Sequence, residues 1–213
     1  MTPTDRQELR RSLRAQRKAL PESDRRRAAT AVARHLLRAR ILQPGQRIAA
    51  YAAIDGEIDP APAIRHAQRL RCALYMPHIA DMRAREMQFV EYRSSPWARE
   101  SKTVVSSRIK SRRRIDPRQL DVVLVPLVAF DDAGWRLGFG AGFYDRKFAF
   151  LLRRLVRKPL LIGLGYELQR VERQNPSQWD VPLHATVTEQ GIRRSRGGSS
   201  PFRFLSSSSI YRR

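Results

Sequence analysis

The chain has 213 residues, of which 42% are hydrophobic, and a formal net charge of +22. This length allows one α/β domain with a full hydrophobic core. No apolar run approaches the roughly 20 residues of a membrane span, and the N-terminal residues hold no apolar segment typical of a signal peptide. We therefore expect a cytoplasmic protein that contacts no membrane. The single cysteine, Cys72, excludes an internal disulfide.

The positive charge is the strongest feature of the composition. The 42 lysines and arginines outnumber the 20 aspartates and glutamates, and they gather in the N-terminal segments, in Lys110–Arg114 and beyond Gly191. Such an excess is compatible with nucleic-acid binding, because Lys and Arg neutralise phosphates. No nucleic-acid motif accompanies it, so we favour a solvated basic surface and expect at most nonspecific contacts with nucleic acid. A basic cleft would also suit small anionic substrates.

Two helices are expected at the N-terminus. Thr4 and Gln7 have the spacing of a capping box, which predicts a helix up to about Leu20. Pro21 ends it, and a second helix is expected over residues 22–39. Arginines recur at helical spacing along the first helix, and the simplest interpretation is a solvated basic face. They are Arg6, Arg10, Arg14 and Arg17.

The following segments alternate between strand and helix patterns. Asp59 and Pro60 are typical of a helix start, so we expect a helix that ends near Leu70. Alternation of this kind predicts an α/β fold, with helices on both faces of a largely parallel sheet, in one three-layer α/β/α domain. The expected strands cover residues 47–52, 72–76, 86–92, 122–128 and 159–164.

The apolar run Val122–Val128 is typical of a strand buried on both faces. A turn follows, then three alternating glycines, Gly138, Gly140 and Gly142, and an amphipathic stretch, residues 143–155, that predicts a helix. A glycine loop between a strand and a helix exposes backbone N–H groups that can hold phosphate. The glycines alone do not establish such a site, since a tight β-to-α connection would have the same pattern.

The longer sequence PLVAFDDAGWRLGFGAGFYDR, residues 126–146, closely resembles the signature of the 5-formyltetrahydrofolate cyclo-ligase family, also called methenyltetrahydrofolate synthetases. Including further similar stretches, the resemblance covers about residues 4–192, with a departure at residues 93–117. Beyond it, residues 193–213 form a basic, serine-rich tail, which we expect to be disordered. The further stretches are residues 51–60, 163–169 and 179–189.

The resemblance implies ATP- and Mg²⁺-dependent cyclisation of 5-formyltetrahydrofolate to 5,10-methenyltetrahydrofolate, with release of ADP and phosphate. Such chemistry needs positioning and charge neutralisation rather than a protein nucleophile. We expect a monomer whose partners are these two substrates. The implied ATP-binding residues are Arg6, Arg10, Arg136, Gly138, Phe139, Gly140, Ala141, Gly142, Phe143 and Tyr144. The implied folate-binding residues are Ala52, Glu57, Phe143 and Tyr144, and the implied Mg²⁺ ligands are Asp145 and Asp180.

Two positions differ from the family pattern. Phe139 stands where many relatives have Arg or Lys, which removes one phosphate partner, and Phe143 replaces a frequent Tyr. Two other functions stay open on the residues alone. One is a different α/β enzyme with a phosphate ligand, such as a phosphosugar isomerase or CoA-transferase relative. The other is a basic nucleic-acid-binding protein.

Overall fold

The computed structural model describes residues 3–92, 113–153 and 158–195. Its helices are α1 (Pro3–Ala19), α2 (Glu22–Arg38), α3 (Ala61–Arg69) and α4 (Phe143–Phe148). Its main strands are β1 (Arg47–Ala49), β2 (Ala73–Asp81), β3 (Glu86–Glu91), β4 (Arg114–Ile115), β5 (Val122–Pro126), β8 (Leu160–Leu164), β9 (Ala185–Thr188) and β10 (Gly191–Arg194). Connecting elements are the hairpin of β6 (Ala129–Phe130) and β7 (Arg136–Leu137) and 3₁₀ turns at Pro117–Gln119, Ala149–Leu152 and Glu167–Gln169.

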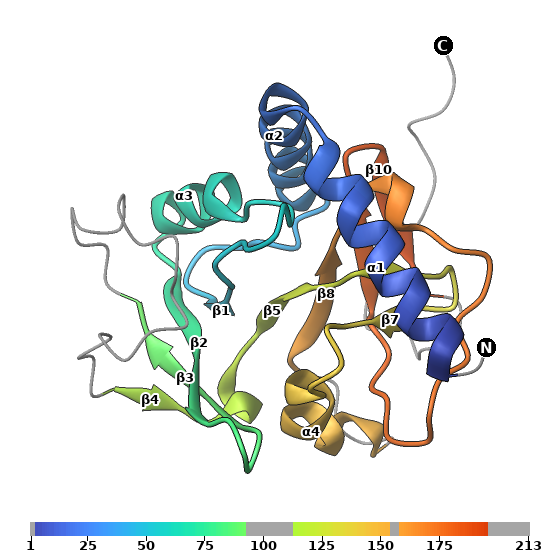
Figure 1. The fold of residues 1–213 in the computed structure, drawn as a ribbon. Coiled ribbons are helices and arrows are strands. Elements are labelled where there is room, and N and C mark those ends of the chain that lie inside the picture. Colours follow the sequence, from blue (N-terminus) through green and yellow to red (C-terminus); the bar gives the residue numbers. More distant parts are fainter. Residues whose placement is uncertain (1–2, 93–112, 154–157, 196–213) are drawn as a thin grey trace.

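The main strands form one sheet in the order β10-β9-β8-β5-β1-β2-β3-β4 (Figure 1). Neighbours from β9 to β2 in this order run parallel. Strand β10 at one edge, and β3 and β4 at the other, pair antiparallel. The prediction of an α/β fold with a largely parallel sheet is therefore confirmed. In the described part of the chain, no helix combines the length and the apolar character that crossing a membrane requires.

Strand β5 shows why the sheet is covered on both faces. Val122 and Leu124 pack in a core with buried residues of α2 and α3, whereas Val123 and Val125 pack in a second core that includes Phe148 of α4. These four β5 side chains are at most 1% exposed. Successive residues of a strand point to opposite faces, so an uninterrupted apolar run needs cover on each side. Figure 1 shows α2 and α3 on one side of the sheet and α4 on the other.

Two elements differ in extent from the sequence prediction. Strand β2 continues beyond Pro77 instead of ending at Met76. It pairs with β1 only up to Tyr75, so Pro77 lies where β3 is the neighbour that pairs with the strand. A proline, which lacks an N–H group, is tolerated there. The helix predicted over residues 143–155 is shorter, because α4 gives way to a 3₁₀ turn where the buried Phe148 ring packs against β3.

Strand β10 carries the folded part beyond residue 192, the predicted domain end. Gly191, with a φ of +148°, turns the chain so that β10 pairs antiparallel with β9. The Arg193 guanidinium then donates to the Glu167 carboxylate. A basic residue that looked typical of a tail is thus part of the sheet edge. Outside the described residues lie the rest of the predicted tail and most of the divergent stretch, residues 196–213 and 93–112.

Ending the chain at residue 192 should therefore destabilise the protein relative to a chain ending at residue 195. The shorter chain loses the end of β10 and the ion pair of Arg193 with Glu167. We expect a melting temperature lower by about 3–8 °C, which corresponds to a loss of roughly 1–2 kcal/mol in the free energy of unfolding for a domain of this size. Thermal unfolding followed by circular dichroism measures the difference. Equal melting temperatures would show that residues 193–195 do not stabilise the fold.

Gln169 joins two segments that are far apart in the sequence. Its side chain is buried, and its Nε2 donates to Leu127 O at 3.0 Å and to Val128 O at 2.9 Å. Its Oε1 accepts from Tyr166 N at 2.9 Å. The two carbonyls lie just after β5, where the chain leaves the sheet. Buried backbone groups need such partners, because water does not reach them.

We predict that Gln169→Leu lowers the free energy of unfolding by about 2–5 kcal/mol, since Val128 O and Tyr166 N lose the Gln169 hydrogen bond and Leu127 O keeps only that of Arg17. Gln68→Leu, on the exposed face of α3, is the matched control and should change it by at most about 0.5 kcal/mol. Urea denaturation measures both variants. The same unfolding midpoint in both would contradict the role of Gln169.

Candidate active site

A cavity of about 1130 Å³ opens at the carboxyl ends of the parallel strands. Tyr51 follows β1, Pro77 lies in β2, Pro126 ends β5, and all three line the cavity. Ligand sites of open α/β sheets lie at this edge. The cavity brings together every residue to which the sequence analysis assigned ligand or metal binding, whereas their individual roles stay predictions. These residues are Arg6, Arg10, Ala52, Glu57, Arg136, Gly138, Phe139, Gly140, Ala141, Gly142, Phe143, Tyr144, Asp145 and Asp180.

The glycine loop, residues 138–142, presents its backbone to this cavity. Gly140 and Gly142 have φ values of +104° and +70°, in the left-handed region that glycine adopts without strain. A Cβ atom at Gly138 or Gly142 would meet no described atom within 4 Å, and one at Gly140 would meet only the Arg10 guanidinium at 3.8 Å. The loop therefore leaves open space in which a phosphate could approach the backbone.

Two arginines of α1 line the cavity beside this loop. Arg10 Nε donates to Gly138 O at 2.9 Å, which fixes the guanidinium against the loop. Burial lowers the pKa of Arg10, and the charge of the neighbouring Arg6 lowers it further. The two like charges repel each other, and an anion bound in the cavity would relieve that repulsion. The cavity thus combines a cationic wall with accessible backbone.

Asp145 and Arg136 form an ion pair at the cavity wall. Arg136 Nη2 donates to Asp145 Oδ1 at 2.6 Å, and Val181 N donates to the same oxygen at 3.1 Å. Asp180 Oδ2 accepts from Ser177 N at 2.8 Å. Each aspartate keeps a second oxygen that accepts no hydrogen bond from the described residues. Among these residues, no group of three or more His, Cys, Asp or Glu side chains could hold a metal ion.

Glu57 is a buried acid in the cavity wall, 6% exposed. Its Oε2 accepts from Ile54 N at 3.1 Å, whereas its Oε1 has no hydrogen-bond donor among the described residues. Oε1 lies 3.8 Å from Arg17 Nη2. Burial raises the pKa of Glu57 to about 7, and the Ile54 N–H group and the Arg17 charge oppose that rise. One buried oxygen of Glu57 is therefore able to accept a hydrogen bond from a ligand.

Local sequence patterns do not reveal the buried position of Arg17. A solvated face is the wrong interpretation for this residue, because its side chain is 0% exposed and donates to backbone carbonyls. Helical spacing alone does not distinguish a buried arginine from a solvated one. The apolar Leu13 one turn earlier, itself buried, is the local signal that this face of α1 packs inward. The cavity lining also includes residues without a predicted role, among them Trp135, Gln174 and Trp179.

Comparisons with known proteins cover most of the chain. A model of the 5-formyltetrahydrofolate cyclo-ligase family matches residues 2–189. The 5-formyltetrahydrofolate cyclo-ligase of Escherichia coli K12 is 33% identical over 152 residues, which cover 68% of this chain and 79% of that protein. The protein of the same name from Haemophilus influenzae is 30% identical over 185 residues, which cover 86% and 97%.

Solved structures give the same result. The Aquifex aeolicus 5,10-methenyltetrahydrofolate synthetase has a TM-score of 0.71 and 29% sequence identity, with coverage of 92% of this chain and 95% of that chain. A 5,10-methenyltetrahydrofolate synthetase from Mycoplasma pneumoniae, at 24% identity, shares the fold with a TM-score of 0.68 and coverage of 87% and 99%. The chain therefore belongs to the 5-formyltetrahydrofolate cyclo-ligase family of enzymes.

Proposed function

We propose that this enzyme uses ATP to convert 5-formyltetrahydrofolate to 5,10-methenyltetrahydrofolate, with ADP and phosphate as the other products. One observation carries the proposal. A single cavity joins an open glycine loop, flanked by Arg6 and Arg10, to the buried Glu57 carboxylate with its unpaired oxygen. The glycine loop and its arginines suit phosphates, and the Glu57 carboxylate suits the N–H donors of a pterin ring. A shared cavity would allow the γ-phosphate to meet the formyl group.

In the proposed reaction, the formyl oxygen attacks the γ-phosphorus of ATP, and ADP leaves. N10 of the folate then attacks the activated formyl carbon and loses its proton. The bond between that carbon and the phosphorylated oxygen breaks, phosphate departs with the oxygen, and the methenyl ring is closed. Neither step requires a covalent bond to the protein. Alignment of the two substrates and neutralisation of phosphate charge are the main contributions that a site of this kind makes.

The triphosphate would lie against the backbone of residues 138–142, with Arg6 and Arg10 as counter-charges. Arg10 is the better fixed of the two, because its Nε is already bonded to Gly138 O. Its other N–H groups are then oriented for a phosphate oxygen. Arg136 suits this role less well than the sequence suggests, because its side chain is 5% exposed and its guanidinium is paired with Asp145.

Mg²⁺ fits this cavity if phosphate oxygens and water complete its coordination. Asp145 and Asp180 each keep one carboxylate oxygen without a hydrogen bond from the described residues. One or two carboxylates together with substrate phosphates form a common Mg²⁺ site. A bound Mg²⁺ would neutralise negative charge on the phosphates. The paired oxygen of Asp145 would continue to hold Arg136 in place.

The folate would donate pterin N–H groups to Glu57 Oε1, the oxygen that lacks a partner. A hydrogen bond to an ionised acceptor is roughly twice as strong as one between neutral groups. Phe143 and Tyr144 of α4 line the same cavity, and their rings offer apolar surface for the flat parts of the ligand. Ala52 also lines this cavity, and its side chain is small enough to leave room for the ligand.

No observation on the described residues favours the nucleic-acid alternative. Part of the basic surface is paired with acids, which lowers its effective charge. These pairs include Arg14–Asp55, Arg26–Glu22, Arg27–Asp24, Arg170–Asp132 and Arg193–Glu167. Family membership likewise gives no support to a phosphosugar isomerase or CoA-transferase relative.

The proposed function is tested by incubating the protein with 5-formyltetrahydrofolate and following the absorbance of the methenyl product. We expect product only when ATP and Mg²⁺ are both present, with ADP formed in equal amount. Omission of ATP, or excess EDTA, should reduce the rate to background. Product formation at the full rate under either condition would contradict the mechanism.

We predict that Arg10→Gln raises KM for ATP roughly 10- to 100-fold, because a hydrogen bond to a charged group contributes about 1.5–3 kcal/mol. KM for the folate should change far less. Arg11→Gln is the matched control on the same helix, since the Arg11 side chain is 81% exposed and does not line the cavity. It should retain wild-type kinetics. If both variants kept the wild-type KM for ATP, Arg10 would not belong to the nucleotide site.

A further inference from the structure

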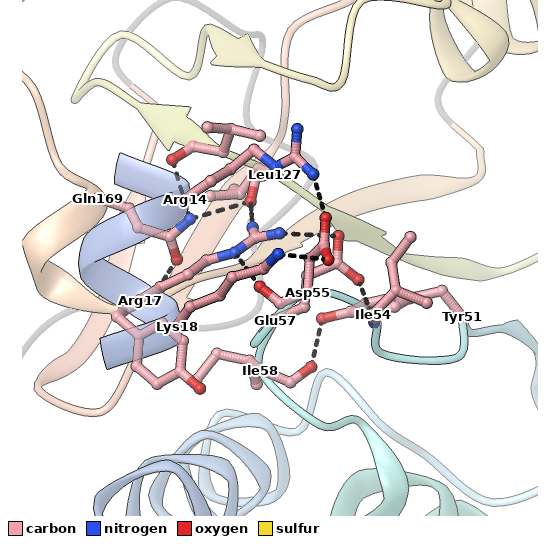
Figure 2. Close-up of polar contacts among 12 residues, drawn as sticks. Arg14, Arg17, Lys18, Tyr51, Ile54, Asp55, Glu57, Ile58, Leu127 and Gln169 are labelled. Atoms are coloured by element: carbon pink, nitrogen blue, oxygen red, sulfur yellow. Dashed lines mark hydrogen bonds and ion pairs between the residues drawn. The ribbon is translucent and has the colours of Figure 1, made fainter. Parts of the chain in front are cut away.

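The buried Arg17 side chain connects the two parts of the cavity wall (Figure 2). Arg17 Nε donates to Asp55 O at 2.8 Å, in the turn before Glu57, and Nη1 donates to Leu127 O at 3.1 Å, just after β5. Its guanidinium also lies over the ring of Phe139, 5.4 Å from the centroid. One side chain of α1 thus contacts the turn that carries Glu57, the end of β5 and the glycine loop.

The remaining nitrogen of Arg17 faces Glu57. Nη2 lies 3.8 Å from Glu57 Oε1, and the two side chains are 0% and 3% exposed. Neither atom has a hydrogen-bond partner among the described residues. The separation is too long for a hydrogen bond, yet it is short enough for a strong attraction between buried charges. Glu57 lines the cavity and Arg17 does not, so a ligand would meet the acid with Arg17 behind it.

The turn that carries Glu57 is packed directly against α1. Asp55 and Gly56 have φ values of +52° and +75°, which form a tight turn. A Cβ atom on Gly56 would lie 3.1 Å from Arg17 O and 3.3 Å from Lys18 Cα, so only glycine allows this approach without displacement. The Asp55 carboxylate pairs with Lys18 at 2.9 Å. These contacts fix Glu57 relative to Arg17.

We propose that Arg17 is a positioning residue of the folate site, an inference that rests on the proposed function. Arg17 keeps the Glu57 carboxylate charged and in place, so that Oε1 is free to accept an N–H group of the folate. Through Phe139, it also ties this acid to the glycine loop. Arg17 does not contact the substrate itself.

The pH dependence of folate binding follows from the surroundings of Glu57. Burial raises the pKa of Glu57 to about 7, and the Arg17 charge opposes that rise. Protonation removes the acceptor, so affinity should fall as the pH drops below about 7, and loss of the Arg17 charge should move this fall to higher pH. The tyrosines nearby stay neutral, because burial raises their pKa values. The groups that face Glu57 are Arg14, Arg17, Asp55, Tyr51 and Tyr144.

The test measures the dissociation constant of 5-formyltetrahydrofolate by calorimetry from about pH 5 to 9, a range that spans this transition. In Arg17→Gln the transition should move up by about one to three pH units, and affinity at pH 7 should fall about 10-fold or more. Arg17→Lys loses the forked hydrogen bonds but keeps the charge, so its transition should stay close to wild type. Arg14→Gln, the same change one turn earlier on α1, should move it less than Arg17→Gln.

The double variants separate positioning from a merely structural role. Glu57→Gln should abolish the transition, and adding Arg17→Gln to it should weaken binding by less than about 3-fold, because coupled residues are not additive. If Arg17→Gln fails to fold, Arg17→Lys is compared alone and in combination with Glu57→Gln. Its loss of folate affinity should then be smaller in the Glu57→Gln background. The proposal would be overturned if folded Arg17→Gln kept the wild-type pH transition of folate binding. It would also be overturned if Arg17→Gln lowered the folate affinity equally in the presence and in the absence of the Glu57 carboxylate. A wild-type protein that forms no methenyl product would instead overturn the proposed function.

Discussion

The candidate site depends on how α1 is anchored by its arginines. Arg10 bonds to Gly138 and Arg17 bonds to Leu127, residues that lie 128 and 110 positions later in the chain. Burying a guanidinium costs several kcal/mol in lost hydration. The buried position of Arg17 is stable because two of its N–H groups donate to the backbone carbonyls of Asp55 and Leu127. The anchoring of α1 therefore exists only in the complete fold.

Leu127 O is the point where two such anchors meet. It accepts hydrogen bonds from Arg17 of α1 and from Gln169 of the 3₁₀ turn after β8. Both donors hold the chain where it leaves β5, shortly before the glycine loop. The glycine loop itself has open space on its cavity side, so its backbone stays accessible to a ligand. The hydrogen bonds from Arg17 and Gln169 hold the chain outside that space. Such preorganisation is what a reaction that depends on alignment requires.

Local sequence patterns predicted the central strand of the sheet and the parallel order of its neighbours. The run Val122–Val128 indicated a strand covered on both faces, and the alternation of strands with helices indicated parallel order. Residues as distant as Glu57 and Asp145 meet in one cavity. Glu57 follows a parallel strand, and in this fold the carboxyl ends of such strands lie at the same edge of the sheet. The resemblance to a family named the residues, and the topology explains why they meet.

Features that depend on distant contacts were not predictable from local patterns. The burial of Arg17 requires carbonyls from two other segments, and the assignment of Arg193 to a sheet edge requires Glu167. The ion pair of Arg136 with Asp145 likewise joins two elements, β7 and α4. In each case the local sequence does not show which carbonyl or acid the arginine contacts. The difference lies in the partner that folding supplies.

A crystal structure with 5-formyltetrahydrofolate, ADP and Mg²⁺ bound would show directly whether the folate and the phosphates lie in the two proposed parts of the cavity. We expect a folate N–H group within hydrogen-bond distance of Glu57 Oε1 and phosphates against residues 138–142 beside Arg10. Arg17 should lie behind Glu57 without contact to either ligand. A folate bound away from Glu57, or phosphates held away from the glycine loop, would contradict this expectation.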